Sequence, residues 1–390
     1  MSSWRECKLG DIAEIIGGGT PSTSNNEFWN GNIPWLTPRD LTGYSKVYIS
    51  HGERFITESG LKNSSAKLMP KGTVLLTSRA PIGYVVIAEN GICTNQGFKS
   101  LVPNFEILNS EFLYYWLKSN TDYLQQLGTG TTFAEISGSV VKNIDISLPS
   151  LEEQKAIAEV LSSLDDKIDL LHRQNQTLES LAQTLFRQWF IEEAKEEWEV
   201  GILDDILSVK GGTTPSTANS DFWDGNISWT TPRDLSSNIG VYLFKTERKI
   251  TEEGLKKISS GLLPIGTVLL SSRAPVGYLA ITDIPLSINQ GYIAILDDKG
   301  FSKYFIYLWL KENMEYIISN ANGSTFLEIS KSVFKSLEIV MPPKELRLKF
   351  DNEIVSTLEK IKINSKQIHT LENLRDTLLS KLLSGEVRVK

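Results

Sequence analysis

An internal repeat covers almost the whole of this 390-residue chain. Residues 17–41 and residues 211–235 are identical at 18 of 25 positions, with an offset of 194. The match continues through the segment SRAP, which begins at Ser78 and again at Ser272, and then into the C-terminal part of the chain. A repeat of this length predicts one folding unit that is built twice.

Each unit begins with a head of mixed strand and helix character. Residues 73–77 and 84–88 are short β-branched and aromatic runs on either side of a Gly/Pro turn, which predicts two joined strands. Residues 111–127 have helical spacing and predict one core helix, with Tyr123 among its aromatic core residues. Residues 142–148 predict a further strand. We therefore predict an α+β fold class for the heads.

A long helix is expected after each head. From about Leu151 to Trp189, apolar residues recur in alternate steps of three and four, and Asn175 is the one polar residue on this seam. A second helix of the same kind closes the chain, and we expect the two to pack antiparallel as a coiled coil. The predicted helix–helix interface consists of Leu161, Leu164, Ile168, Leu171, Leu178, Leu185, Ile354, Ile361, Ile368, Leu371 and Leu378.

Opposite net charges support this pairing. Residues 151–199 carry 5 basic and 12 acidic side chains, whereas residues 344–390 carry 10 basic and 7 acidic ones. Charges of opposite sign favour contact between the two helices over self-association. The alternative is a pair of amphipathic helices that lie on separate heads. Asn175 either fixes the register of the coiled coil or faces solvent.

These elements predict four segments in tandem. The heads are expected at residues 1–150 and 198–343, and the helices at residues 151–197 and 344–390. Because the two units are near copies, a pseudo-two-fold axis should relate them and place one head at each end of the helix pair.

Composition sets further limits. No run approaches 18 apolar residues, and the first ten residues lack an apolar signal segment, so we expect a cytoplasmic protein with no membrane partner. Cys7 and Cys93 lack the spacing of metal ligands and are expected to be free thiols. The formal net charge of −7 lies on the central helix. The heads are near neutral, so composition alone does not demonstrate a nucleic-acid surface.

The sequence contains little evidence of catalytic motifs. It contains no phosphate-binding P-loop, nucleophile elbow or zinc-protease motif, and the glycines at 17–19 do not continue as a dinucleotide fingerprint. None of the three histidines and neither cysteine has a counterpart in the other half. A catalyst of either type would act in one half only. We therefore expect a non-enzymatic protein without a cofactor or a metal.

The repeat does preserve loops rich in hydroxyl, amide and guanidinium groups. Short hydroxyl side chains and exposed backbone N–H groups suit phosphate contacts, whereas Arg, Asn and Gln are the residue types that read guanine and adenine edges. The candidate DNA-binding residues are Thr20, Ser22, Thr23, Arg39, Arg79, Asn95, Gln96, Thr131 and Thr132, with Thr214, Ser216, Thr217, Arg233, Arg273, Asn289, Gln290, Ser324 and Thr325 in the second half.

A purely structural role is the alternative for each of these positions. Arg39 could simply pair with Asp40, and Pro81 and Gly83 could serve only to shape a turn. The repeated tryptophans are more often core residues than stacking platforms. They are Trp29, Trp35, Trp223 and Trp229.

Two heads with GGTPS-like loops and with SRAP[IV]G and NQG segments, each followed by a long helix, resemble the specificity subunit of type I restriction-modification systems. The resemblance covers essentially the whole chain. It implies that each head is a target-recognition domain that reads one half of a bipartite double-stranded DNA site. It also implies that the helices dock two methyltransferase subunits, that restriction subunits with motor and nuclease activity complete the complex, and that this chain is not catalytic.

The similarity of the two heads adds a prediction of its own. Near-identical readers related by a two-fold axis should select near-inverted half-sites, so we expect a target close to a palindrome. Asymmetry could arise at Asn26/Ser220, Pro34/Ser228, Leu36/Thr230, Tyr44/Asn238 and Phe98/Tyr292.

Two other functions stay open at this stage. One is a bivalent protein-binding adaptor, and the other is a part of a combined restriction-methylation enzyme. A DNA reader should lose affinity steeply as ionic strength rises, which distinguishes it from the adaptor.

Overall fold

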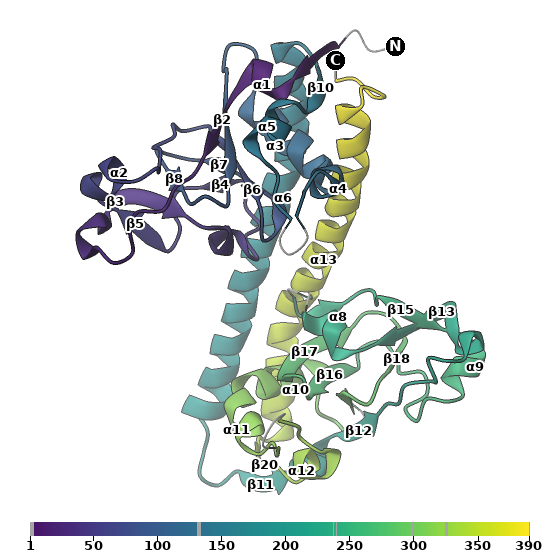
Figure 1. Ribbon diagram of the computed structural model, residues 1–390. Coiled ribbons are helices and arrows are strands. Elements are labelled where there is room, and N and C mark those ends of the chain that lie inside the picture. Colours follow the sequence, from purple (N-terminus) through teal and green to yellow (C-terminus); the bar gives the residue numbers. More distant parts are fainter. Residues whose placement is uncertain are drawn as a thin grey trace. The chain divides into compact units, whose positions relative to one another are not determined.

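The chain forms two compact units, each with one head and a part of both long helices (Figure 1). Unit 1 comprises Met1–Asp169 and Thr370–Lys390, and unit 2 comprises Leu170–His369. The computed structural model describes residues 4–130, 134–236, 238, 240–297, 299–323 and 327–389.

The long helices are α6 (Leu151–Arg187) and α13 (Lys344–Leu383). In unit 2 the ring centres of Phe186, near the end of α6, and Phe350, near the start of α13, lie 5.9 Å apart. The two helices therefore run antiparallel, as the seam predicts. Their apolar positions also close the core of unit 1, where Leu161 of α6 and Leu382 of α13 belong to one buried cluster.

The predicted seam residues differ in how deeply they are buried. The buried ones are Leu161, Ile168, Leu171, Ile354, Ile361 and Ile368, and the half-buried ones are Leu164, Leu178, Leu185, Leu371 and Leu378. Sequence analysis missed Phe186 and Phe190, which are 1% and 8% exposed. Residues 188–192 form a π-helical turn, whose extra residue rotates Phe190 inward and leaves Trp189 half-buried.

Asn175 meets polar partners across the helix pair rather than solvent. It is half-buried, and its amide donates to Oγ of Ser365 over 3.2 Å. The amide of the fully buried Asn364 donates to Oδ1 of Asn175 over 3.0 Å. A polar pair inside an apolar seam fixes the register of two helices, because any shift would leave these groups without partners.

Ion pairs join the long helices to each other, in agreement with the predicted attraction, and also join them to the heads. In unit 1 Arg375 of α13 lies 2.8 Å from Asp165 of α6, which is an interhelical ion pair. In unit 2, however, Lys362 lies 2.7 Å from Asp283, and Glu179 accepts from Lys311. Both of these pairs join a long helix to the head of the same unit. Charge therefore secures the heads on the helices as well as the helices on each other.

The core of each head is a five-stranded sheet. The first is β2 (Ala13–Gly17), β9 (Lys99–Pro103), β6 (Val74–Ser78), β7 (Ile82–Ala88) and β4 (Tyr48–Ile49), in that spatial order. The second is β12 (Ser208–Gly211), β19 (Tyr292–Leu296), β16 (Val268–Ser272), β17 (Val276–Thr282) and β14 (Tyr242–Leu243). Neighbours are antiparallel except for the last pair of each sheet, which is parallel. The matching order shows that the sequence repeat is a repeat of topology.

Smaller sheets complete each head. The first head has β5 (Arg54–Ile56), β3 (Trp29–Leu36) and β8 (Cys93–Thr94) in one sheet, and β1 (Arg5–Lys8) with β10 (Asp145–Leu148) in another. The second head has β15 (Arg248–Ile250), β13 (Trp223–Thr230) and β18 (Leu286–Ile288), and β11 (Glu199–Ile202) with β20 (Glu338–Met341).

Short helices connect these strands. In the first head they are α1 (Leu9–Ile12), η1 (Asn26–Phe28), η2 (Pro38–Leu41), α2 (Glu58–Lys62), α3 (Ser110–Ser119), α4 (Thr121–Gln126) and α5 (Gly138–Lys142). In the second they are α7 (Leu203–Ile206), η4 (Ser220–Phe222), α8 (Pro232–Ser236), α9 (Glu252–Leu255), α10 (Lys303–Glu312), α11 (Met314–Ser319) and α12 (Lys331–Lys335).

The single helix predicted over residues 111–127 is wrong, because α3 and α4 are separate helices that meet at Asn120. This residue leaves helical geometry, with φ −103° and ψ 20°, and its side chain donates to the carbonyl of Trp116 over 2.8 Å. Asparagine competes for backbone partners in this way and often ends a helix. The break turns Tyr123 outward, so it is 44% exposed rather than a core residue.

The predicted hairpin is present, with shifted boundaries. Strands β6 and β7 pair antiparallel, and β7 begins at Ile82 instead of Tyr84. The strand predicted over residues 142–148 begins only at Asp145. It is shorter because the residues before it form α5, where Oγ of Ser137 accepts from the N–H of Val140 over 3.2 Å.

Both cysteines are free thiols. Burial raises the pKa of the Cys93 thiol to about 12, which makes it unreactive at neutral pH. No helix in the described part of the chain is long and apolar enough to span a membrane.

Candidate nucleic-acid interface

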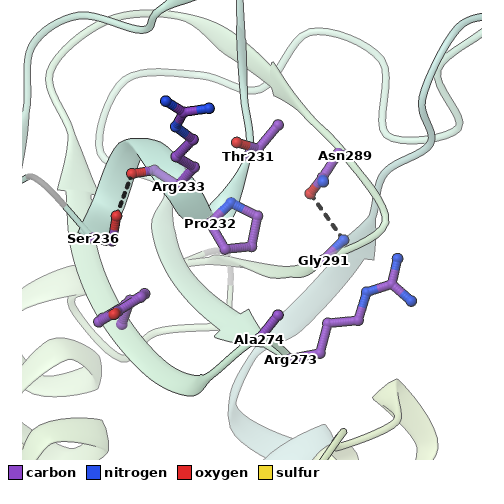
Figure 2. A pocket seen from close by; sticks show the side chains of 9 residues that line it. Thr231, Pro232, Arg233, Ser236, Arg273, Ala274, Asn289 and Gly291 are labelled. Atoms are coloured by element: carbon purple, nitrogen blue, oxygen red, sulfur yellow. Dashed lines mark hydrogen bonds between the residues drawn. The ribbon is translucent and has the colours of Figure 1, made fainter. Parts of the chain in front are cut away.

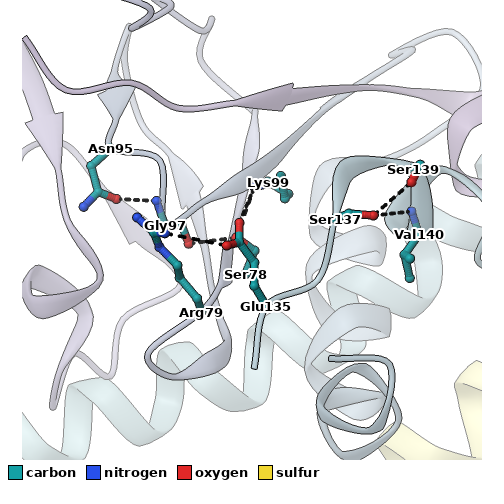
Figure 3. A network of polar contacts seen from close by, with 9 residues as sticks. All are labelled: Ser78, Arg79, Asn95, Gly97, Lys99, Glu135, Ser137, Ser139 and Val140. Carbon is teal, nitrogen blue, oxygen red and sulfur yellow. Dashed lines mark hydrogen bonds and ion pairs between the residues drawn. The ribbon is translucent and has the colours of Figure 1, made fainter. Parts of the chain in front are cut away.

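Loops that are far apart in the sequence meet at one edge of the first head. The hydroxyl of Thr20 donates to Oε1 of Gln96 over 2.5 Å. Oδ1 of Asn95 accepts from the N–H of Gly97 over 2.8 Å, and the carbonyl of Gly97 accepts from the N–H of Ser78 over 2.7 Å. Three of the predicted DNA-binding segments therefore form one connected polar surface, which Figure 3 shows in part.

Arg79 brings a fourth segment to this surface. It directly follows β6, and the next residue, Ala80, has the left-handed φ of 48°, which turns the chain sharply. Nη1 of Arg79 lies 3.6 Å from Oε2 of Glu135. Glu135 and Thr129 exchange backbone hydrogen bonds of 3.0 and 3.1 Å, so the two residues form an antiparallel bridge. The predicted residues Thr131 and Thr132, which are close to Glu135 in sequence, lie outside the described residues.

Lys99 also belongs to this surface and was missed by sequence analysis. Its ammonium lies 3.0 Å from Oε1 of Glu135 and 3.5 Å from Oγ of Ser78 (Figure 3). The repeat does not indicate Lys99, because Ile293 stands at the equivalent position in the second half. The difference between the two halves is itself the signal that could have found it.

The second head repeats this geometry. Thr214 donates to Gln290 over 2.7 Å, and Oδ1 of Asn289 accepts from the N–H of Gly291 over 2.9 Å. Nη1 of Arg273 lies 3.7 Å from Oε2 of Glu328. The predicted residues Ser324 and Thr325, which are close to Glu328 in sequence, lie outside the described residues.

An open hollow of about 410 Å³ lies in this part of the second head (Figure 2). Its lining includes Arg233, Arg273 and Asn289, all predicted from the sequence, together with Ala274 and Gly291. Two guanidinium groups and one amide around a concave surface can recognise phosphates and base edges.

Arg39 and Asp40 do not form the ion pair that the structural alternative requires. Oδ2 of Asp40 accepts from the N–H and the hydroxyl of Thr37, each over 2.7 Å, and Oδ1 accepts from the N–H of Glu53 over 2.8 Å. The Asp40 carboxylate therefore stabilises its own loop, and the Arg39 side chain is exposed. In the second head Arg233 lies 3.8 Å from Glu247, but both side chains are more than 60% exposed and solvent screens the pair.

The four repeated tryptophans are core residues that support the first loop. They are 3–7% exposed. Nε1 of Trp35 donates to the carbonyl of Gly19 over 2.8 Å, and Nε1 of Trp29 donates to that of Ser22 over 3.0 Å. The guanidinium of Arg54 lies 3.5 Å from the ring centre of Trp29. These rings hold the hydroxyl-rich loop in place and leave no face free for a base.

The remaining predicted residues of this loop are exposed and lie apart from the hydrogen-bonded surface. Oγ of Ser22 lies 2.8 Å from Oγ of Ser24. Within the described residues, this hydroxyl makes no contact with the other predicted DNA-binding residues. The exposed members of this group are Ser22, Thr23, Ser216 and Thr217.

Gly18 allows the first loop to lie directly against the NQG segment. A methyl group added at Gly18 would lie 1.9 Å from the carbonyl oxygen of Asn95, whereas one added at Gly17 would meet nothing within 4 Å. Only a residue without a side chain permits this approach.

Both residues are buried in two of the five differences proposed to create asymmetry, and in a third Pro34 is buried while Ser228 is half-buried. Leu36 and Phe98 are fully buried, and so are their counterparts Thr230 and Tyr292. The hydroxyl of Tyr292 lies 3.2 Å from that of Thr230, so the two replacements form a matched polar pair in the core of the second head. These positions cannot contact DNA directly. Asn26/Ser220 and Tyr44/Asn238 remain at the surface.

The surface offers donors and positive charge rather than catalytic groups. Within the described ranges no three His, Cys, Asp or Glu side chains gather as a metal site would require. Hydroxyls, amides and arginines, which can bind anions and base edges, meet here beside Glu135 in the first head and Glu328 in the second.

Comparison with known proteins identifies the family. The sequence model of the type I restriction modification DNA specificity domain matches twice, over residues 1–180 and 195–374. The chain belongs to the type I specificity-subunit family.

Two relatives of this specificity subunit match over nearly their whole length. The MjaIX specificity subunit of Methanocaldococcus jannaschii is 37% identical, over 99% of this chain and 94% of the relative. The HindI specificity subunit of Haemophilus influenzae is 26% identical, over 99% and 100%. The crystal structure of the specificity subunit from M. genitalium has the same fold, with a TM-score of 0.61 and 18% identity over 97% of this chain and 96% of that one. The resemblance inferred from the motifs is thus confirmed.

Proposed function

We propose that this specificity subunit selects the DNA target of a type I restriction-modification complex, with each head reading one half of a bipartite duplex site. The observation that supports this most directly is the repeated surface. The segment of Arg79 is hydrogen-bonded to the NQG segment that contains Asn95 and Gln96, as the equivalent segments are in the second head. There Arg273 and Asn289 line one hollow. Arginine and asparagine discriminate guanine and adenine in the major groove.

The two half-sites are expected to be nearly inverted copies. Shared residues cannot distinguish two sequences, and the differences Leu36/Thr230 and Phe98/Tyr292 are buried, where they cannot contact DNA. Two similar readers on inverted half-sites give a target close to a palindrome.

The long helices are the proposed docking surface for methyltransferase subunits. Large apolar side chains on them are exposed in repeat-related pairs: Leu170 and Ile363 are 44% and 57% exposed, and Leu181 and Leu374 are 47% and 44% exposed. Exposed apolar residues of this size commonly mark protein contacts. Two equivalent sets favour two methyltransferase subunits, on which the restriction subunits would assemble.

The proposal is tested by co-expressing the chain with the methyltransferase of its own system and mapping methylated bases by long-read sequencing. The expected result is a bipartite motif with inverted, similar halves. Dissimilar halves would contradict the near-palindrome, and a stable complex without any motif would contradict the recognition role.

Matched variants assign each half-site to a head. Arg79→Ala should relax one half of the motif and Arg273→Ala the other, because each removes one base-reading or phosphate-binding group. Replacing the proposed second head, residues 198–343, by a copy of residues 1–150 should give a perfect palindrome. If both single variants relaxed the same half, the assignment of one head to one half-site would be wrong.

A further inference from the structure

One lysine occupies different places in the two otherwise similar heads. The first head has Lys99 on β9 and Gly138 at the start of α5, where the second has Ile293 and Lys331. In the first head the lysine stem passes over the glycine, because a methyl group added at Gly138 would lie 3.9 Å from Cδ of Lys99. The absence of a side chain at position 138 leaves room for this path.

In the second head the positive charge moves to the hydroxyl-rich loop. Ile293 is 1% exposed and carries no charge. Lys331 is exposed, and a methyl group added at Gly211 would lie 2.8 Å from its ammonium. A methyl group added at the equivalent Gly17 would meet nothing within 4 Å. The ammonium of Lys331 therefore covers the base of the loop that contains Thr214, whereas that space is open in the first head.

The two lysines differ in their partners as well. Lys99 is 16% exposed and lies 3.0 Å from one oxygen of Glu135, while Arg79 lies 3.6 Å from the other. Glu135 would therefore keep a counter-ion if Arg79 moved away from it. Glu328 has Arg273 as its ion-pair partner, and Lys331 has no ion pair with any residue in the described ranges.

We propose that Lys99 is a positioning residue that neutralises Glu135 and so releases Arg79 for base readout, and that Lys331 binds a DNA phosphate beside the loop of Thr214. The inference rests on the proposed function and adds a reason why two similar heads act unequally. The first head gains discrimination from its lysine, and the second gains salt-dependent affinity. Lysine binds phosphate as a point charge, so its contribution carries no sequence information.

The test uses the full complex with its methyltransferase, the duplex that carries the mapped motif, and duplexes altered in one half-site. Binding is followed by fluorescence anisotropy at several salt concentrations. Lys331→Gly, which installs the residue of the first head, should weaken binding to all duplexes alike and reduce the slope of log K against log salt by roughly one phosphate, about 0.9. Lys99→Ile should lower discrimination at the first head's half-site about tenfold, the effect of one base contact, with the slope unchanged.

Two further variants separate positioning from a structural role. Lys99→Arg should retain the discrimination of the wild type, because arginine also neutralises Glu135. The double variant Lys99→Ile/Gly138→Lys reproduces the second head's arrangement and guards against poor packing of the single Lys99→Ile substitution. An unchanged slope in Lys331→Gly overturns the phosphate contact. Unchanged discrimination in both Lys99→Ile and the double variant overturns the positioning role. If the wild-type complex binds the motif and a scrambled duplex equally, the proposed function itself fails, whatever the lysine variants do.

Discussion

The amide of Asn364 donates a hydrogen bond of 3.0 Å to Oδ1 of Asn175 inside the helix pair of unit 2. Asn364 is fully buried, and its own Oδ1 has no partner in the described structure. In the alignment of the two halves, Leu171 is equivalent to Asn364, and Ile368 is equivalent to Asn175. The helices therefore contain two polar residues where their counterparts are apolar, an arrangement that specifies register at a cost in stability.

This pair gives the first prediction. Asn175→Ala should destabilise unit 2 by about 1–3 kcal/mol, because it removes an acceptor of a buried amide. Asn175→Ile/Asn364→Leu, which installs the apolar counterparts, should be neutral or stabilising, because no buried polar group is left unpaired. Urea denaturation of the full chain measures both, and equal losses in the two variants would contradict the explanation.

Gly18 and Gly17 form a second test. Gly18→Ala should cost about 1–3 kcal/mol, since the methyl group would overlap the carbonyl of Asn95 and force the loop away from the NQG segment. Gly17→Ala should change the free energy of unfolding little, because the space beside it is open. Thermal denaturation and DNA affinity are measured together, and a similar effect of the two substitutions would argue against close packing at Gly18.

The tryptophans allow a graded prediction. Trp35→Phe keeps a buried ring but removes the 2.8 Å hydrogen bond to Gly19, so we expect a loss of about 1 kcal/mol and weaker DNA binding. Trp229→Phe removes a longer contact of 3.4 Å to Thr213 and should cost less. Calorimetry and duplex binding provide the comparison, and the reverse order would contradict it.

Asp283 predicts a pH dependence. Burial of its carboxyl favours the neutral form, but the ammonium groups of Lys362 and Lys366, each at 2.7 Å, outweigh burial and hold the pKa of Asp283 below its usual range. A carboxyl with a lowered folded-state pKa stabilises the fold above its unfolded pKa, and this contribution is lost as pH falls through the folded value.

Asp283→Asn should therefore destabilise unit 2 at pH 7, and its difference from the wild type should shrink below about pH 4. Glu89→Gln is the matched control, because Glu89 is the exposed counterpart in the first head and has no ion pair with a described residue. Thermal denaturation from pH 7 to pH 3 measures the difference, and a constant gap between Asp283→Asn and the wild type would refute the linkage.

The exposed apolar residues of the long helices predict how many methyltransferase subunits the complex contains. Leu181→Glu should remove one methyltransferase subunit from the complex, and Leu181→Glu/Leu374→Glu should remove both, because each places a charge in an apolar contact. Gln176→Glu, at an exposed polar position of α6, should leave the complex intact. Native mass spectrometry counts the subunits, and full assembly of the double variant would exclude these residues from the interface.

The sequence by itself determined the repeat, the α+β class, the two long helices and the family. These features depend on patterns that are local or that recur along the chain: a heptad seam, strand-forming runs and two copies of the same motifs. Side-chain chemistry also selected Arg79, Asn95 and Gln96, which the fold places on one surface.

Only the tertiary structure decided which groups meet. Lys99 joined the surface because the fold brings β9 beside Glu135, and the repeat could not indicate a residue that it does not share. The burial of Leu36 with Phe98 and the inward turn of Phe190 likewise depend on contacts between residues far apart in the chain. Local preference fixes the type of an element, whereas long-range packing decides which face is buried, and this is why the chemistry of the site could be predicted while its connections could not.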